Sequence, residues 1–387
     1  MDDRHARPQE PARTTPDAPP ARPGAEPTDQ RDGPGQEAAR PFTLAEPPSA
    51  DQAQSLGVAL GPAVVNACEG RLSDIEWFRS PWQRSGSATG RGVWRQDGSE
   101  RRVMVKVPVG YREWFWTTRL NTCSAETGRP CPVPRVLAHG LELDGYDIAW
   151  LVEERLDGRP GSARMDPDEV DRIMDAAARF HAIAPHAAPL ADGKDQTGRG
   201  PDGPIRRDWA KLLASARRGA QDNPIPGRDR WLRAIAALEP VLDRFTGPWE
   251  RRPIDTWCHG DLHPGNVIRR EAAEDHEADC MLLDLALVHA GSWIEDALDL
   301  ERLYWGRRHL LGGVDPLERL AEARRRHGLE SRDPGGRIAA ARRVLMAATS
   351  PAALTRFSDP VYLDAALSVL EQGLELEPEP APADPEA

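Results

Sequence analysis

Two carboxylates and one amide with a spacing suited to phosphoryl transfer lie in the second half of the chain. Asp261 is followed five residues later by Asn266, and Asp284 comes directly after the apolar run 281–283. An Asp and an Asn at this spacing occur in the catalytic loop of kinases, where the carboxylate accepts the proton of the attacked hydroxyl and the amide binds Mg²⁺. A second carboxylate supplies a further hard oxygen ligand for the ion. The pattern indicates phosphoryl transfer.

A single lysine in the first part of the chain fits the same chemistry. Lys106 lies in an alternating strand-like segment and is the only lysine before residue 194. An ammonium held by a helix carboxylate can neutralise the phosphates of a nucleotide. Glu113, at the start of the next predicted helix, is the expected partner, and Glu126 is the weaker one. The alternative is a lysine on the solvent face of a strand.

The histidines around Asp261 permit a different interpretation. His259 and His263 flank Asp261 with one residue between each pair. Together the three could bind zinc or two metal ions, as in hydrolases. Such a site needs further ligands, which the sequence does not make obvious. This interpretation also leaves Lys106 and Asn266 unexplained.

The residues around Lys106 have the pattern of a small β-sheet with one helix. Asp97-Gly98 predicts a hairpin turn between strands near 93–94 and 102–107. A helix is expected from Tyr111 to Leu120, and further strands near 136–137 and 148–152. The Gly/Ser segment 85–92 could place backbone amides over phosphates, although no G-x-x-x-x-G-K-[ST] pattern is present.

From Gly158 onward the pattern becomes helical. Asp166-Pro167 predicts an N-cap followed by a proline in the first turn, and the amphipathic repeat continues through Phe180. A polar loop is expected at 188–206. Further helices are expected at 230–245, 316–327, 336–349 and 359–370. The residues around Asp261 lie between these helices, in a hairpin-like region from 256 to 287.

Composition divides the 387 residues into a body and two tails. Residues 1–50 are rich in Pro, Ala and Arg, residues 371–387 are acidic, and both are predicted to be disordered. An N-lobe is expected at 51–155 and a helical C-lobe at 156–370. Of the formal net charge of −12, residues 1–50 carry −3 and residues 371–387 carry −6, which leaves the body nearly balanced.

The same composition argues against several classes of partner. No basic stripe with interleaved aromatic residues is present, so nucleic acid is not expected. No apolar stretch is long enough to span a bilayer, so no membrane association is expected. The five cysteines form no C-x-x-C pair, which suits a reducing, cytoplasmic environment. The expected partner is a small molecule.

The octapeptide His259–Asn266 resembles the signature of the aminoglycoside phosphotransferase family, relatives of choline and fructosamine kinases. The similarity extends over about residues 70–370. The segment Leu283–Ala286 resembles the family's metal-binding motif. Glu295–Leu300 resembles the acidic stretch in which Asp296 or Asp299 bonds the backbone of the catalytic loop. Gly260 replaces the arginine of protein kinases, which argues against a protein substrate.

The resemblance implies an α+β, two-lobed, protein-kinase-like fold with a small β-rich N-lobe, a larger helical C-lobe and ATP between them. The adenine is expected on backbone groups near Glu153, Glu154 and Arg155, and Lys106 on the α- and β-phosphates. The resemblance also assigns Asp261 as the base, and Asn266 and Asp284 as Mg²⁺ ligands. His263 either approaches the γ-phosphate or makes hydrogen bonds within the loop.

The expected function is ATP-dependent transfer of a phosphoryl group to a hydroxyl of a small molecule. An aminoglycoside-like antibiotic is one possible acceptor, and Glu295, Asp296 and Glu301 are the acidic residues that could bind such a polycation. The alternatives are a metabolic kinase for choline, a sugar or an amino alcohol, and a nucleotide-binding module without catalysis. The last would lack Lys106 or one of the three catalytic-loop and metal residues, and all are present.

Overall fold

The computed structural model describes residues 50–78, 86–158, 160–161, 165–190, 207–270, 279–333, 336–354 and 358–375, without the side chains of 50–54. By internal contacts the chain divides at residues 46 and 47, and all described residues belong to the second unit. The predicted tails up to residue 49 and beyond 375 lie outside the described residues, as does most of the predicted loop at 188–206.

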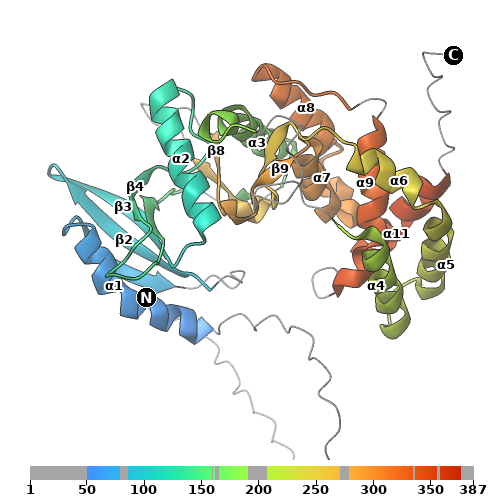
Figure 1. The fold of residues 1–387 in the computed structure, drawn as a ribbon, viewed down its shortest axis with the longest axis horizontal. Helices are drawn as coiled ribbons and strands as arrows, with labels where there is room; N and C mark the ends of the chain where they lie inside the picture. Colours follow the sequence, from blue (N-terminus) through green and yellow to red (C-terminus); the bar gives the residue numbers. More distant parts are fainter. Residues whose placement is uncertain are drawn as a thin grey trace, which may run out of the picture. The chain divides into compact units, whose positions relative to one another are not determined.

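The N-terminal part is a five-stranded antiparallel sheet with strand order β1-β2-β3-β5-β4 (Figure 1). The predicted hairpin between β2 and β3 is confirmed, with Gln96 paired to Ser99 across Asp97 and Gly98. Both turn residues have positive φ, 51° and 75°, the backbone that a two-residue hairpin of this type requires. The strands are β1 (Leu72–Phe78), β2 (Ala88–Gln96), β3 (Ser99–Val107), β4 (Val136–Gly140) and β5 (Trp150–Glu154).

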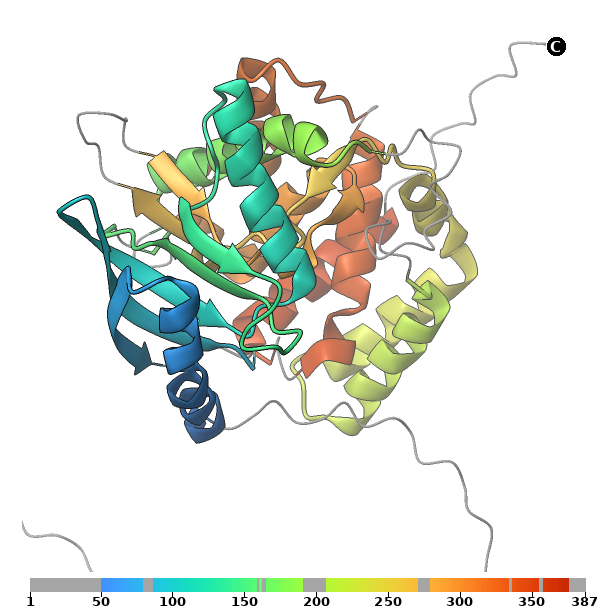
Figure 2. The same ribbon diagram turned by 60° about the vertical axis from the view of Figure 1, so that its left-hand side comes forward.

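Two helices accompany this sheet, α1 (Ala50–Ala67) and α2 (Tyr111–Thr127) (Figure 2). Helix α2 starts where it was predicted. Helix α1 was not predicted, because it contains two glycines and a proline that weaken its helical pattern. Gly57 is needed for packing, since a Cβ atom there would lie 2.6 Å from the ring of Trp77.

The second part of the chain is mainly helical. Helix α3 begins at its predicted cap, where the Asp166 carboxylate accepts a hydrogen bond from the Glu169 amide at 2.9 Å. The predicted helix at 230–245 is two helices, and α4 was not predicted. The last helix continues to Glu375, so residues 371–375 are helical and not part of a tail. The helices are α3 (Pro167–Ala187), α4 (Trp209–Asp222), α5 (Arg228–Leu238), α6 (Asp243–Glu250), α7 (Ile294–Leu303), α8 (Pro316–Arg326), α9 (Arg337–Ala348) and α11 (Pro360–Glu375).

Two short antiparallel ladders separate α6 from α7 and confirm the predicted hairpin-like region. Strand β6 (Thr256–Cys258) pairs with β9 (His289–Gly291), and β7 (Val267–Arg270) pairs with β8 (Asp279–Leu282). The segment 259–266 connects β6 to β7, and the segment 283–288 connects β8 to β9. The two connecting segments therefore lie at adjoining ends of the ladders.

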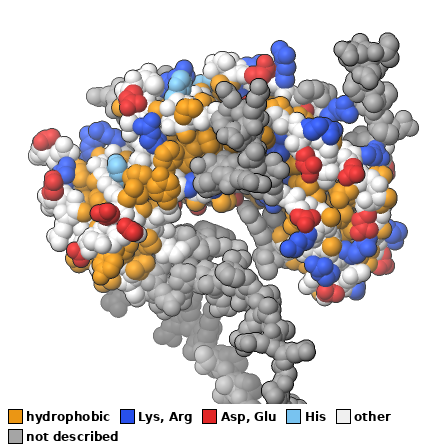
Figure 3. Space-filling view, in the orientation of Figure 1, with side chains coloured by type: hydrophobic (Ala, Val, Ile, Leu, Met, Phe, Trp, Pro, Cys, Tyr) orange, Lys and Arg blue, Asp and Glu red, His pale blue; other side chains and the backbone are white. Residues whose placement is uncertain are grey.

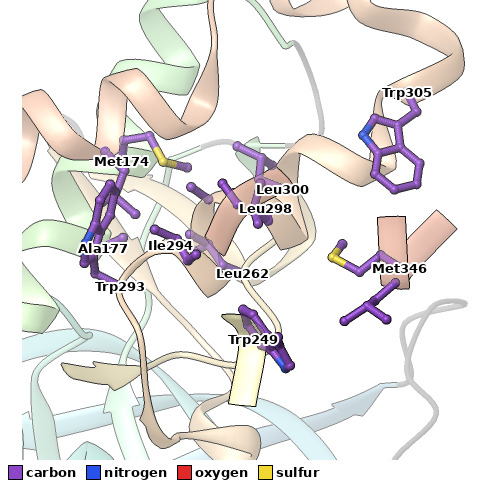
Figure 4. Close-up of a cluster of buried hydrophobic side chains, with 14 of the residues drawn as sticks. Met174, Ala177, Trp249, Leu262, Trp293, Ile294, Leu298, Leu300, Trp305 and Met346 are labelled. Atoms are coloured by element: carbon purple, nitrogen blue, oxygen red, sulfur yellow. The ribbon is translucent and has the colours of Figure 1, made fainter. Parts of the chain in front are cut away.

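The larger core joins the helices to these ladders. Leu262, directly after Asp261, is buried among apolar residues that include Ile294 and Leu298 of α7 (Figure 4). On the other side, the Trp116 ring of α2 lies 4.8 Å from that of Trp257 in β6. Helix α2 therefore connects the N-terminal sheet to the strand that leads into the segment 259–266.

Candidate active site

Lys106 on β3 points toward acidic groups. Its Nζ lies 2.8 Å from Glu113 Oε1 on α2 and 3.8 Å from Glu153 Oε2 on β5. Burial acts to lower the pKa of Lys106, but Glu113, Glu153 and Asp284 outweigh it and raise the pKa above its ordinary value. Of the two predicted partners, Glu113 rather than Glu126 makes the contact. The ammonium stays charged and lies within electrostatic range of Asp284.

The end of β5, where adenine contacts were expected, is already occupied by sheet hydrogen bonds. The Glu154 amide donates to the Arg135 carbonyl at 2.8 Å, and the Arg155 amide donates to the Arg102 carbonyl at 3.0 Å. The Glu154 carboxylate accepts from the Arg135 amide at 2.9 Å. These two backbone donors are therefore used because β5 lies between β3 and β4. Burial raises the pKa of Glu153, despite the nearby ammonium of Lys106.

Asp261 and Asn266 face each other across a 3₁₀ turn at Pro264–Asn266. Asn266 Nδ2 donates to the Asp261 carbonyl at 3.0 Å and lies 3.4 Å from its Oδ2. The Leu283 amide donates to the Asn266 carbonyl at 2.8 Å. This bond places Asp284, the next residue, at the same end of the β7–β8 ladder as Asn266. The amide oxygen of Asn266 and the Asp284 carboxylate are the hard donors that Mg²⁺ prefers.

Asp284 is exposed although it follows three apolar residues. Strand β8 ends at Leu282, two residues before it. Its backbone has φ 59° and ψ 68°, a left-handed conformation that is uncommon outside glycine. Such conformations cluster at functional sites. Here the conformation ends the strand and begins the turn that leads to β9.

The two histidines of the loop do not form a metal site with Asp261. His259 Nε2 lies 2.9 Å from the Leu283 carbonyl, so it must donate, and its Nδ1 accepts from the Asp261 amide at 3.4 Å. Both ring nitrogens of His259 are used, and the metal-cluster interpretation is wrong. His263 Nδ1 accepts from the Gly265 amide at 3.0 Å, while its Nε2 lies 3.7 Å from Asp261 Oδ2.

Asp296 of α7 holds the backbone of this loop. Its two carboxylate oxygens accept from the amides of His259 at 2.9 Å and Gly260 at 3.1 Å. His181 Nε2 donates to it at 2.9 Å, because Arg324 Nη1 donates to the other ring nitrogen at 2.9 Å. Burial acts to raise the pKa of Asp296, but the bond from His181 and its charged surroundings lower it. Of the two residues predicted to bond the backbone of the catalytic loop, Asp296 rather than Asp299 makes these contacts.

Gly260 is required by its position. It has φ +82°, and a Cβ atom would lie 2.2 Å from the Leu287 carbonyl oxygen. The absence of an arginine here thus has a steric cause, because no side chain fits.

A cluster of potential metal ligands lies behind the loop, where Cys258, His289 and Glu295 are buried with ligand atoms within 4.8 Å of one another. His289 Nδ1 lies 2.9 Å from the Leu287 carbonyl and must donate, so Nε2 needs its own proton to face Glu295 Oε2 at 3.4 Å. Burial acts to lower the pKa of His289, but the Glu295 carboxylate raises it. An imidazolium–carboxylate pair therefore accounts for this arrangement.

The carboxylates predicted to bind a polycation are already paired. Glu295 accepts from Arg252 Nε at 2.9 Å, and Glu301 accepts from Arg343 Nη2 at 2.5 Å. Both are almost fully buried, as is Asp296. These acids are internal partners of arginine and histidine, so the prediction that they bind a polycationic acceptor is wrong.

The glycine segment also has a packing explanation. Residues 88–92 belong to β2, and Ser85 lies outside the described residues. A Cβ atom at Gly90 would lie 2.7 Å from Ile75, and one at Gly92 would lie 3.0 Å from Leu72. These glycines let β1 pack closely on β2.

Within the described part of the chain, no helix is both long and apolar enough to cross a membrane. On the face drawn in Figure 3, acidic and basic side chains are interspersed over the described surface.

Comparison with known proteins identifies the family and the fold. The model of the phosphotransferase enzyme family matches residues 83–337. A Ralstonia eutropha protein assigned as an aminoglycoside phosphotransferase is 16% identical, with a TM-score of 0.50 over 81% of this chain and 97% of its own. An aminoglycoside phosphotransferase of Alicyclobacillus acidocaldarius is 18% identical, with a TM-score of 0.48 over 80% of this chain and 95% of its own. No curated protein sequence matches. The predicted α+β, kinase-like fold is confirmed.

Proposed function

This chain belongs to the phosphotransferase enzyme family, and we propose that it transfers the γ-phosphoryl group of ATP to a hydroxyl of a small molecule. The observation that supports this most directly is the meeting of two distant parts of the chain. The Lys106 ammonium, paired with Glu113, interacts with Asp284. Asp284 directly follows Leu283, whose amide donates to the Asn266 carbonyl, and Asn266 is bonded to Asp261.

In the proposed reaction, the acceptor oxygen forms a bond to the γ-phosphorus while the bond to the bridging oxygen breaks and ADP leaves. Asp261 accepts the proton of the acceptor hydroxyl. Asn266 orients this base through the bonds that its amide makes to the Asp261 carbonyl and carboxylate. Lys106 neutralises the α- and β-phosphates, and Glu113 keeps its ammonium in position.

Asn266 and Asp284 are the residues that would hold Mg²⁺. The Nδ2 atom of Asn266 is turned toward Asp261, which directs its Oδ1 to the other side. An amide oxygen and an exposed carboxylate at one end of a ladder form a suitable donor set. The ion, when bound, would neutralise charge on the β- and γ-phosphates.

The base is held in place before any substrate binds. Asp296 accepts hydrogen bonds from the two amides that precede Asp261. Leu262, the residue that follows Asp261, is 1% exposed and packs in the core. A loop fixed on both sides loses little conformational freedom at the transition state, which favours catalysis by positioning.

The test is Asp261→Asn in the full-length chain. Turnover with a mixed panel of hydroxyl acceptors should fall by about 10²–10⁴-fold, because the proton acceptor is lost. ADP affinity should not change, because Asp261 faces the acceptor. Unchanged ATP consumption by the variant would refute the role of Asp261. A wild-type protein that binds ADP and transfers phosphate to none of the acceptors would instead be a nucleotide-binding module.

Asp284, the proposed metal ligand, is tested by a separate pair of variants. Asp284→Asn should reduce Mg²⁺-dependent ADP binding, measured by calorimetry with and without the ion. Asp144→Asn is the matched control, because Asp144 is also exposed and also has positive φ, at 51°. Equal affinities in both variants would count against Asp284 as a ligand.

A further inference from the structure

The helix that supports the catalytic loop also faces a concentration of arginines. Glu295 and Asp299 of α7 interact electrostatically with four guanidinium groups that come from different segments. These are Arg207 before α4, Arg252 after α6, Arg302 on α7 and Arg342 on α9. Four guanidinium groups and the His289 imidazolium therefore share two carboxylates. Asp296 is the third acidic residue of the segment Glu295–Leu300. Its carboxylate accepts hydrogen bonds from the backbone of the catalytic loop and from His181.

Arg342 is the unusual member of this arginine cluster. Its side chain stacks on the Trp249 ring at 4.5 Å and lies 5.7 Å from the Trp209 ring. It is 6% exposed, yet within the described residues it makes no hydrogen bond or ion pair, and its buried Nε has no acceptor. Burial lowers the pKa of Arg342 to about 10, although Asp299 and Glu295 act in the opposite direction. A buried guanidinium without an acceptor is costly unless a ligand supplies one.

The three neighbouring arginines add positive charge around Arg342. Arg252 donates from Nε to Glu295 at 2.9 Å and from Nη1 to the Trp249 carbonyl, but its buried Nη2 has no acceptor among the described residues. Asp299 lies 3.6 Å from Arg302. Arg207 is exposed at the edge of the cluster. One exposed arginine and two buried guanidinium nitrogens without an acceptor among the described residues form an arrangement suited to an anion.

The arginine cluster is also close to the catalytic loop. Asp299 follows Asp296 by three residues of α7, a rise of about 4.5 Å along the helix. Asp296 contacts the backbone of Gly260, which directly precedes Asp261. A small molecule could therefore contact the arginines with one end while its hydroxyl reaches Asp261.

We infer that Arg207 and Arg342 bind an anionic group of the acceptor, a carboxylate or a phosphate. The inference rests on the proposed function and narrows its acceptor to a small hydroxyl compound that carries negative charge. A polycationic antibiotic would be repelled by the same arginines. Arginine suits this role because its planar donors match the oxygen pairs of carboxylate and phosphate groups.

The test uses equilibrium binding without nucleotide, so that it does not depend on turnover. The full-length chain is titrated at constant ionic strength with three probes that share one backbone: glycerol, glycerate and glycerol 3-phosphate. Glycerate or glycerol 3-phosphate should bind at least about tenfold more tightly than glycerol, because charge-assisted hydrogen bonds are added. The better of the two identifies the anionic group as carboxylate or phosphate.

The variants locate the site. Arg207→Gln should weaken binding of the preferred anionic probe by about tenfold or more, and Arg342→Met should abolish it. Arg218→Gln is the matched control, because Arg218 is an exposed arginine on α4 outside the cluster. Arg207 is exposed, so its replacement tests the inference without disturbing the buried part of the cluster.

Two results would overturn the inference: equal binding of charged and neutral probes, or equal losses in the Arg207 and Arg218 variants. ADP affinity, measured in parallel, should be the same in all of these proteins. Failure of the proposed function has a different signature, which is retained anion binding with no phosphate transfer to any acceptor.

Discussion

Two acidic residues one turn apart on α7 have opposite surroundings. Asp296 is fully buried and accepts bonds from two backbone amides and His181, and its pKa is lowered despite its burial. Among the described residues, Asp299 has one ion pair, with Arg302 at 3.6 Å, and burial raises its pKa despite the nearby arginines. Buried polar networks contribute to a unique structure when every member is satisfied. The hydrogen bonds of Asp296 are made within the protein, whereas near Asp299 the buried Arg342 Nε and Arg252 Nη2 have no acceptor among the described residues.

The largest expected difference in the free energy of unfolding is between variants of Asp296 and of Asp299. Asp296→Asn should lower the free energy of unfolding by about 3–5 kcal/mol, because a charged acceptor is removed from a buried network. Asp299→Asn should cost less than about 1 kcal/mol, because its surroundings already disfavour the charge. Urea unfolding of both variants measures the difference. Similar losses would mean that the two sides of α7 do not differ as described.

An intermediate effect is expected for the two buried arginines. Arg324 donates to His181 and, from Nε and Nη2, to the Glu330 carbonyl, whereas Arg342 has no such partner among the described residues. Arg324→Met should therefore cost about 2–3 kcal/mol. Arg342→Met should be neutral or stabilising without ligand, because methionine keeps the apolar packing and removes an unsatisfied charge. Thermal unfolding compares the pair, and a greater loss for Arg342→Met would contradict the comparison.

The smallest effect is a pH dependence of opposite sign for two buried histidines. Burial lowers the pKa of His181 below its ordinary value of 6.5. The stability that neutral His181 contributes is complete above that value and is lost as the pH falls. The pKa of His289 is raised by Glu295, although burial opposes this. Its contribution is complete below 6.5 and is lost as the pH rises through the raised pKa.

Thermal unfolding of the two histidine variants from about pH 5.5 to about pH 8.5 would measure this. The loss from His181→Gln should shrink toward acid, and the loss from His289→Gln should shrink toward base, each by about 1 kcal/mol. His309→Gln is the control, because His309 is exposed. Parallel pH profiles for the two buried sites would show that the assigned protonation states are incorrect.

Sequence patterns predicted the elements with strong local signals. The Asp97-Gly98 turn, the Asp166 cap and the start of α2 depend on a few neighbouring residues and were found. Helix α1 was missed because its glycines serve contacts with Trp77 on another element. The spacing predicted that Asp261 and Asn266 lie close together, whereas the pairing of β7 with β8 brings Asp284 to the same end of that ladder as Asn266.

Other features of the site depend on contacts that spacing does not reveal. The acids of α7 were expected to face a ligand, but the ladders and α3 bury them against arginine and histidine partners. The donors at the end of β5 are used because strands lie on both sides of it. The helical part carries a compositional signal of these internal pairs, because residues 156–370 contain 29 arginines and two lysines, and arginine is the better suited of the two to buried ion pairs.

The sequence by itself determined the reaction class, because phosphoryl transfer needs a small set of residue types at a short and recognisable spacing. Only the tertiary structure decided which of the remaining charges are internal partners and which lack one. The reason is that the state of a buried charge depends on neighbours from distant segments. Arg207, Arg252 and Arg342 meet α7 from separate parts of the chain.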